Sequence, residues 1–308
     1  MIGISDVASY IPPASLSNLE RAAALGKTPE FIRDKIGFLR VARKQAQQET
    51  SDLAVRAFEA LEAKRRIDRA AIDCLVVCTQ NPDAHGLPHT AAVLQGKLGL
   101  AQQVAAFDIS LGCSGFVYSL AVVSAFMEAN DLKQGLLFTA DPYSKILAPD
   151  DADTGLLFGD AAAVTYLTAQ PLYRPLRSRF ASDGKLSHSI QVPRAGGQLS
   201  MLGSNVFKFT MTVVPEQIEA CLRDNGLSKD DVDIYLFHQG SKFIVDNLGK
   251  KLGLTPGQAP FEAAEVGNTV SSTLPLMLER RLQAGPPRIL LSGFGVGLSW
   301  ATTVLQRV

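Results

Sequence analysis

The chain has 308 residues, of which 46% are hydrophobic and 19% are charged. This composition is typical of a globular protein with a large buried core and excludes a disordered or fibrous chain. Basic and acidic residues balance at 30 each, so no overall charge favours nucleic acid, and the apolar runs are shorter than the roughly 18 residues that span a bilayer. We therefore expect a protein that binds neither nucleic acid nor a membrane.

The first predicted element is a strand that begins directly after Met1, with the sequence I-G-I-S-D-V-A, so we expect no signal peptide. Pro12 and Pro13 then open a loop, and residues 29–35 begin a short helix that ends near Gly37. Ser51 starts a longer helix with one apolar face. The residues on that face are Leu53, Ala57, Ala60 and Leu61.

From this point the order of predicted elements occurs twice. I-D-R-A-A-I-D at residues 67–73 leads into a strand at 74–78, and L-S-K-D-D-V-D at 227–233 leads into a strand at 234–237. K-L-G-L ends a predicted helix at residues 97–100 and again at 251–254, and strands follow at 135–139 and 288–292. Glycine turns at 157–167 and 294–305 enter the closing strands. Such repetition indicates gene duplication with a pseudo-twofold axis.

The repeat predicts an N-terminal half, residues 1–172, and a C-terminal half, residues 173–308, with the break in a turn near residues 171–175. Strands that alternate with helices in each half predict an α/β protein with helices on a largely parallel or mixed sheet. Residues 183–203, rich in Gly, Ser and Pro, are expected to form a loop that covers the junction.

Cys113 lies at the predicted corner between a strand and a helix, in the sequence F-D-I-S-L-G-C-S-G-F. A thiol at the first turn of a helix faces unpaired N–H groups and the positive end of the helix dipole, which favour the thiolate. Cys113 is therefore a candidate nucleophile, and a buried structural cysteine is the alternative. The other cysteines are Cys74, Cys78 and Cys221; they form no C-x-x-C pair or zinc spacing, and free thiols indicate a reducing cytoplasm.

His238 and Asn268 are the candidate partners of Cys113, since each is predicted to follow a strand equivalent to the one before Cys113. Loops at the carboxyl ends of such strands meet near the axis of a duplicated α/β protein. A thiolate can attack an acyl thioester while His and Asn side chains donate N–H groups to the developing oxyanion. Taken singly, a core histidine and a plain asparagine turn are the alternatives for these two residues.

Two other interpretations of the sequence are rejected. G-F-G-V-G at residues 293–297 is no dinucleotide fingerprint, because only 11 residues follow and none of them is acidic. His85 and His89 lie in a loop with no third ligand nearby, so we expect no metal site. Cys74 and Cys78 share one face of a strand and are expected in the core.

Five motifs together resemble the β-ketoacyl-acyl carrier protein synthase III family of the thiolase-like superfamily. They are D-I-S-L-G-C-S-G-F-V-Y, L-F-G-D-A-A-A, F-H-Q-G, E-V-G-N-T-V-S-S and G-F-G-V-G-L-S-W, in this order over almost the whole chain. The resemblance implies a duplicated, five-layered αβαβα thiolase-like fold and a homodimer. It also implies an acyltransferase that initiates fatty acid biosynthesis by decarboxylative Claisen condensation, with no metal or redox cofactor.

The resemblance assigns roles to individual residues. Cys113 would carry the acyl group, and His238 and Asn268 would bind the thioester carbonyl of malonyl-acyl carrier protein. The backbone N–H groups of Cys113 and Val296 would form the oxyanion hole. The substrate pocket would include Phe31, Leu87 from the partner subunit, Phe158, Asn205, Ser241 and Phe294. Acyl carrier protein would dock on Lys208, Lys250 and Lys251, and the acyl donor would be acyl-CoA or another acyl thioester.

The chain departs from the family where adenine of CoA usually stacks between a Trp and an Arg, because it has Phe31 at the first position and Ala152 and Asp153 near the second. Ser241 replaces a usual Asn. One alternative is thus a related acyltransferase of secondary metabolism with a non-malonyl acceptor. Another is a catalytically silent partner subunit of a heterodimer, which the complete set of Cys113, His238 and Asn268 argues against.

Overall fold

The computed structural model of the protein describes residues 1–148, 150–193, 197–283 and 285–308. Its strands are β1 (Gly3–Tyr10), β2 (Ser15–Ser17), β3 (Arg40–Ala42), β4 (Cys74–Cys78), β5 (Ala105–Ile109), β6 (Gln134–Ala140), β7 (Ala162–Thr168), β8 (Tyr173–Pro175), β9 (Arg179–Ser182), β10 (Ile190–Gln191), β11 (Ser200–Met201), β12 (Ile234–Phe237), β13 (Arg288–Gly295) and β14 (Ser299–Arg307). Its α-helices are α1 (Asn18–Arg21), α2 (Pro29–Phe31), α3 (Thr50–Lys64), α4 (Thr90–Leu98), α5 (Gly115–Ala129), α6 (Gly203–Asp224), α7 (Lys242–Leu252) and α8 (Thr273–Glu279).

Strand pairing joins the two halves of the chain into one ten-stranded sheet. The order is β12-β13-β14-β8-β1-β7-β6-β4-β5, and β9 also pairs with β14. β4 is parallel to β5 and to β6, and β12 is parallel to β13. Because parallel strands end at the same edge, the segments that follow β4, β5 and β6 meet there.

The predicted repeat of elements is present in the structure. In each half one parallel pair of strands is followed by two antiparallel pairs. The strand order is β4-β6-β7-β1 in the first half and β12-β13-β14-β8 in the second half. The two K-L-G-L sequences end α4 and α7, where Gly99 and Gly253 adopt left-handed φ values of 62° and 73°. The boundary between residues 172 and 173 stays a prediction.

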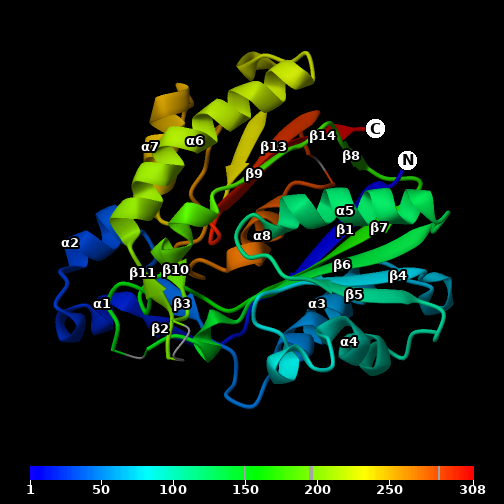
Figure 1. Cartoon of the computed structure of the whole chain (residues 1–308), viewed down its shortest axis with the longest axis horizontal. Helices are drawn as coiled ribbons and strands as arrows, with labels where there is room; N and C mark the ends of the chain where they lie inside the picture. Colours follow the sequence, from blue (N-terminus) through cyan, green and yellow to red (C-terminus); the bar gives the residue numbers. More distant parts are fainter. Residues whose placement is uncertain (149, 194–196, 284) are drawn as a thin grey trace.

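Alternate side chains of the strands face different layers of helices. In β4, Leu75 and Val77 pack with α3 and α4, whereas Val76 on the opposite face packs with α5. In β12, Leu236 packs in the α5 and α8 core, whereas Phe237 faces the α6 and α7 side. Figure 1 shows α5 and α8 between the two groups of strands, with α3 and α4 on one outer side and α6 and α7 on the other. The layer order is therefore αβαβα, as the thiolase-like fold requires.

Three local predictions were wrong. The turn near residues 171–175 contains β8, which pairs with both β1 and β14; Pro175 is tolerated at the end of this short strand. Residues 259–267, which include Pro260, contain no strand, so Asn268 does not follow one as predicted. Asn268 itself forms an isolated bridge with Phe158. The loop predicted at 183–203 contains a 3₁₀ segment (Gly184–Ser189) and the hairpin β10–β11; its residues 194–196 lie outside the described residues.

Candidate active site

Cys113 lies at the corner between β5 and α5, as predicted. The Gly115 N–H donates to the Gly112 carbonyl at 2.8 Å and closes the turn, and α5 begins at Gly115. The hydroxyls of Ser114 and Ser299 are 2.7 Å apart, which ties the corner to β14. Cys113 is 6% exposed, so its thiol is largely buried.

The glycines of the G-F-G-V-G segment allow backbone to approach Cys113. A Cβ on Gly295 would lie 2.6 Å from the Cys113 sulfur, and one on Gly293 would lie 2.7 Å from the Cys113 carbonyl oxygen. Both distances are too short for real Cβ contacts, so only glycine fits. The segment joins the antiparallel strands β13 and β14 instead of opening a helix, in agreement with the rejection of a dinucleotide site.

His238 follows β12 directly. Its backbone N–H donates to the Ser292 carbonyl at 2.9 Å, which continues the pairing of β12 with β13 by one residue. The imidazole packs edge-on against Phe294, with 5.6 Å between ring centroids and 90° between planes. Among the described residues its Nδ1 has no hydrogen-bond partner, and burial lowers the pKa of His238 to about 3. The ring is therefore neutral at pH 7.

Asn268 is held by its backbone and by its own side-chain oxygen. Its N–H donates to Leu157 O at 2.8 Å, and its carbonyl accepts from the Gly159 N–H at 2.9 Å. The side-chain Oδ1 accepts from the Val270 N–H at 2.9 Å. Because Oδ1 is engaged there, the amide Nδ2 remains available to donate into the adjoining cavity.

A single cavity of about 460 Å³ brings the three candidate catalytic side chains together. The predicted residues that line it are Cys113, His238, Asn268, Phe31, Phe158, Ser241, Phe294 and Val296. The walls are mostly apolar, with few convergent polar groups, as is usual for pockets that bind small molecules. The arrangement suits attack by sulfur on an acyl carbonyl whose oxygen is met by N–H donors.

The corner was predicted to favour the Cys113 thiolate, and its N–H groups do lower the pKa, but the net shift is in the other direction. Burial raises the pKa of Cys113 to about 12, and the negative charge of Asp141 adds to the shift. The N–H groups of Val296 and of Cys113 itself hydrogen-bond to the sulfur and lower the pKa, but by less than burial raises it. Desolvation of the buried thiolate therefore outweighs the effect of the helix N-terminus on the pKa. These two N–H groups are those assigned to the oxyanion hole.

Two of the predicted pocket residues lie outside the cavity. Leu87 is 86% exposed, on the segment between Asp83–Gly86 and α4. Asn205 donates from Nδ2 to Ser189 Oγ at 3.3 Å, and its neighbours Ser204 and Val206 line the cavity instead. Ser241 lines the cavity and also caps α7, because its Oγ accepts from the Ile244 N–H at 3.2 Å.

The three lysines of the predicted carrier-protein surface are exposed and lie on neighbouring helices. Lys208 is in α6, and Lys250 and Lys251 are in the last turn of α7, which contacts α6. Figure 1 shows these two helices side by side on one outer face. The Lys251 Nζ donates to the Met211 carbonyl at 2.7 Å, so part of its hydrogen-bonding capacity is used within the protein.

Sequence reasoning missed an aromatic group on the cavity wall. Tyr143 is 3% exposed, packs on Phe158 with 4.7 Å between ring centroids, and donates from its hydroxyl to Gln80 Oε1 at 3.3 Å. Lys35 and Phe243 also line the cavity, and the Lys35 Nζ lies 4.2 Å from the ring centroid of Phe243. Neither pair has a signal in the sequence, since its members are far apart along the chain.

The remaining candidates show no site. The part of the chain that the structure describes contains no cluster of three or more His, Cys, Asp or Glu that could hold a metal ion, and His85 and His89 are exposed. Cys74 and Cys78 are buried, as predicted, and burial raises the pKa of both thiols. Over the same described residues, we find no helix with the length and apolarity needed to cross a membrane.

The fold and this cavity define a thiolase-like α/β enzyme of the acyltransferase type. A family model described as 3-oxoacyl-[acyl-carrier-protein (ACP)] synthase III matches residues 107–184, and the model of its C-terminal part matches residues 222–307.

Whole-chain comparisons agree. The chain is 31% identical to the beta-ketoacyl-[acyl-carrier-protein] synthase III of Lactococcus lactis subsp. cremoris (strain SK11), and 33% identical to that of Streptococcus equi subsp. zooepidemicus (strain MGCS10565), over 98% of each chain in both cases. A crystal structure of the synthase III from Thermus thermophilus is 29% identical and superposes with a TM-score of 0.92 over 99% of both chains. The chain belongs to the beta-ketoacyl-[acyl-carrier-protein] synthase III family, and it is a condensing enzyme of that type.

Proposed function

We propose that this enzyme transfers an acyl group from an acyl thioester to Cys113 and condenses it with malonyl-acyl carrier protein, initiating fatty acid synthesis. The observation that carries the proposal is the meeting of Cys113, His238 and Asn268 in one cavity. Family membership supports the same reaction, because the names of the relatives specify beta-ketoacyl synthesis on an acyl carrier protein.

In the first half-reaction the Cys113 sulfur attacks the carbonyl carbon of the acyl thioester. The N–H groups of Cys113 and Val296 hydrogen-bond to the sulfur, and this supports a role for both as donors to the carbonyl oxygen as it becomes an oxyanion. The thiol must lose its proton as it attacks, since burial raises the pKa of Cys113 to about 12, and this proton ends on the departing donor sulfur. The carbon–sulfur bond of the donor then breaks, and the donor thiol leaves with a proton.

In the second half-reaction malonyl-acyl carrier protein loses carbon dioxide. The electron pair of the broken carbon–carbon bond forms an enolate, whose oxygen accepts hydrogen bonds from His238 and from Asn268 Nδ2. The enolate carbon attacks the acyl carbonyl on Cys113, the carbon–sulfur bond breaks, and the Cys113 thiolate takes one proton from solvent. The product is a β-ketoacyl group on the carrier protein.

Intact-protein mass spectrometry tests this sequence of steps. The enzyme is incubated with a panel of acyl-CoAs and acyl carrier proteins, and then with malonyl-acyl carrier protein. We expect a Cys113 adduct of the mass of one acyl group, followed by its disappearance as a β-ketoacyl product forms. An adduct that survives the second addition contradicts the condensation step, and no adduct with any donor contradicts the first step.

One feature of the cavity favours a second function. Its lining has Phe31 at the position where family members that use CoA typically carry a Trp, and Ala152 and Asp153 near the position of their Arg. Asp153 is paired with Lys27 Nζ at 3.7 Å and supplies no positive charge for the phosphates of CoA, as an Arg would. Under this alternative, an acyl carrier protein delivers the acyl group and a non-malonyl nucleophile removes it. The mass-spectrometry experiment separates the two functions, because only the second leaves the adduct intact after malonyl-acyl carrier protein is added.

The surface of Lys208, Lys250 and Lys251 is proposed to dock the acidic acyl carrier protein. Exposed positive charges on the adjacent helices α6 and α7 support this, since complementary charge accelerates encounter. Replacing Lys250 with Glu should raise the KM for malonyl-acyl carrier protein several-fold and leave the KM for malonyl-CoA unchanged. Equal effects on both substrates would contradict the docking role.

We also propose a homodimer in the cytoplasm. β5 is at the end of the sheet order, and His89 Nε2 lies 3.3 Å from the Ala106 carbonyl, so the segment with the exposed Leu87 runs beside that edge strand. An edge strand with apolar side chains next to it is suited to pairing with a second copy. Light scattering after gel filtration should give twice the chain mass, and a monomer at micromolar concentration would contradict the dimer. Cell fractionation tests the location.

A further inference from the structure

Asp141 is a buried carboxylate that none of the proposed chemical steps uses. It follows β6, is 0% exposed, and lies close enough to Cys113 for its charge to raise the pKa of that thiol. Burying a carboxylate is costly unless donors surround it. The contacts of Asp141 are therefore informative about why it is there.

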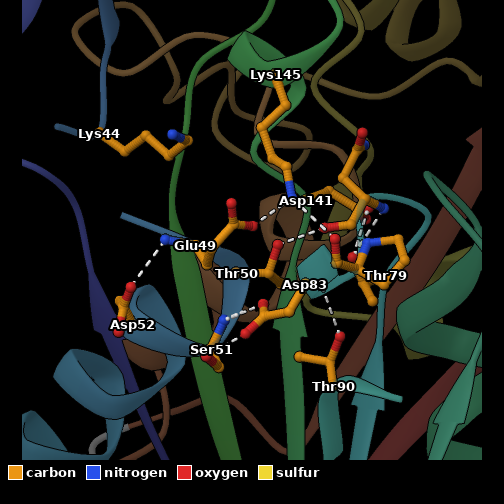
Figure 2. Close-up of polar contacts among 12 residues, drawn as sticks. Lys44, Glu49, Thr50, Ser51, Asp52, Thr79, Asp83, Thr90, Asp141 and Lys145 are labelled. Atoms are coloured by element: carbon orange, nitrogen blue, oxygen red, sulfur yellow. Dashed lines mark hydrogen bonds and ion pairs between the residues drawn. The ribbon is translucent and has the colours of Figure 1, made fainter. Parts of the chain in front are cut away.

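The two carboxylate oxygens of Asp141 join different parts of the chain. Oδ1 accepts from the Gln80 N–H at 2.7 Å and from the Thr79 hydroxyl at 3.2 Å, both in the segment after β4. Figure 2 shows Asp141 beside Thr79 in this segment. Oδ2 accepts from the Ser271 hydroxyl at 2.5 Å, and the Ser271 N–H also faces the carboxylate and lowers its pKa. Asp141 thus ties the end of β4 to the 3₁₀ segment Val270–Ser272.

That 3₁₀ segment orients Asn268. Val270, directly before Ser271, adopts a left-handed φ of 54°, a conformation that a β-branched residue keeps only where its surroundings impose it. In this conformation the Val270 N–H donates to Asn268 Oδ1 at 2.9 Å. This bond decides which end of the Asn268 amide faces the cavity.

We propose that Asp141 is a positioning residue for the condensation step, because through Ser271 it holds the Val270 turn that points Asn268 Nδ2 into the cavity. The inference rests on the proposed function. It makes Asn268 the end of a chain of contacts that runs from Asp141 through Ser271 and Val270. Acylation of Cys113 depends on a different pair of donors, so the two half-reactions respond differently when this chain is broken.

The test uses Ser271→Ala, which removes the hydroxyl and adds no volume. Decarboxylation of malonyl-acyl carrier protein and formation of the Cys113 adduct are measured separately on the full chain. We expect decarboxylation to fall about tenfold, the effect of one buried hydrogen bond, and acylation to stay within about twofold of the wild type. Asp141→Asn should also slow decarboxylation. The NH₂ group of the new Asn would replace one carboxylate oxygen and would face the donors that now bond to Asp141.

Ser51→Ala is the matched control. Ser51 is also fully buried and donates from Oγ to a buried aspartate, Asp83 Oδ2, at 2.5 Å. Figure 2 shows this pair, which joins the first turn of α3 to the segment Asp83–Gly86. Among the described residues its other hydrogen bonds go to Lys97 and Thr90 and not to Asn268. If any lost Ser–Asp hydrogen bond in the core slows the enzyme, decarboxylation should fall equally in the two variants. If Ser271 positions Asn268, decarboxylation should fall only in Ser271→Ala.

A double-mutant cycle with Asn268→Ala distinguishes positioning from a general structural role. If Ser271 acts through Asn268, Ser271→Ala has no further effect on decarboxylation once Asn268 is Ala. The same tenfold loss in both backgrounds, or a Ser271→Ala variant as fast as the wild type, overturns the inference. A wild-type enzyme that leaves malonyl-acyl carrier protein intact overturns the proposed function and the inference with it.

Discussion

The corners that carry Cys113 and Asn268 occupy equivalent places in the two halves but are held in different ways. Cys113 follows a regular strand, precedes a helix of 15 residues, and is fixed by backbone that approaches closely at Gly293 and Gly295. Asn268 follows irregular chain and precedes a helix of 7 residues. Its corner is fixed by polar side chains, including Ser272, whose hydroxyl donates to the Thr139 carbonyl at 3.0 Å.

The difference corresponds to the chemistry proposed for each corner. The nucleophile needs free space on one side of its sulfur and N–H groups on the other, which packed glycine backbone provides. The side-chain amide of Asn268 must present its nitrogen, and not its oxygen, to the cavity. A hydrogen bond to the oxygen selects this orientation. Changes at the Cys113 corner should therefore affect acylation first, and changes at the Asn268 corner should affect condensation first.

The largest expected effect is that of Cys113→Ala, which removes the nucleophile. No acyl adduct should form with any donor, because no other thiol lines the cavity among the described residues. Intact-protein mass spectrometry checks this, with Cys221→Ala as a control that keeps the adduct. A labelled acyl group that persists on the Cys113→Ala variant would falsify the assignment.

Asn268→Ala should lower condensation about a hundredfold, since it removes one oxyanion donor, and should affect acylation much less. His238→Ala should also lower condensation by about this factor. Single-turnover measurements of each half-reaction provide the check. An equal loss in both half-reactions for Asn268→Ala contradicts the separation of the two corners.

Gly295→Ala tests the role of backbone approach at the Cys113 corner. The added Cβ would lie 2.6 Å from the Cys113 sulfur, so either the sulfur or the strand must move, and we expect acylation to fall about tenfold. Gly96→Ala in α4 is the control, because a Cβ there meets no atom within 4 Å and alanine favours a helix. Comparable acylation rates in the two variants would show that the close approach is unimportant.

The smallest change is one of pH alone. Because burial raises the pKa of Cys113 to about 12, the thiolate fraction should increase about tenfold per pH unit from pH 7 to pH 9. The rate of alkylation of Cys113 by iodoacetamide should follow it, read by mass spectrometry of the modified peptide. A rate that levels off near pH 8 would mean that the N-terminal end of α5 and the two N–H groups outweigh the effect of burial on the pKa of Cys113.

The sequence by itself determined the order of elements and the three candidate catalytic residues. Glycines at fixed positions and alternating apolar runs are local signals, so the corner at Cys113 and the strand before His238 could be predicted and are present. The expectation that these side chains meet followed from a general rule of α/β sheets, and all three line one cavity.

Only the tertiary structure decided the properties that depend on packing between distant segments. The pKa of Cys113 is raised by burial in a cavity whose walls come from both halves of the chain, whereas local sequence pointed the other way. The contact of Asp141 with Ser271 joins residues 130 positions apart, and β8 unites the sheet through pairs with β1 and β14. No periodicity records such contacts, because their energies depend on desolvation and on geometry that exist only once the layers have packed.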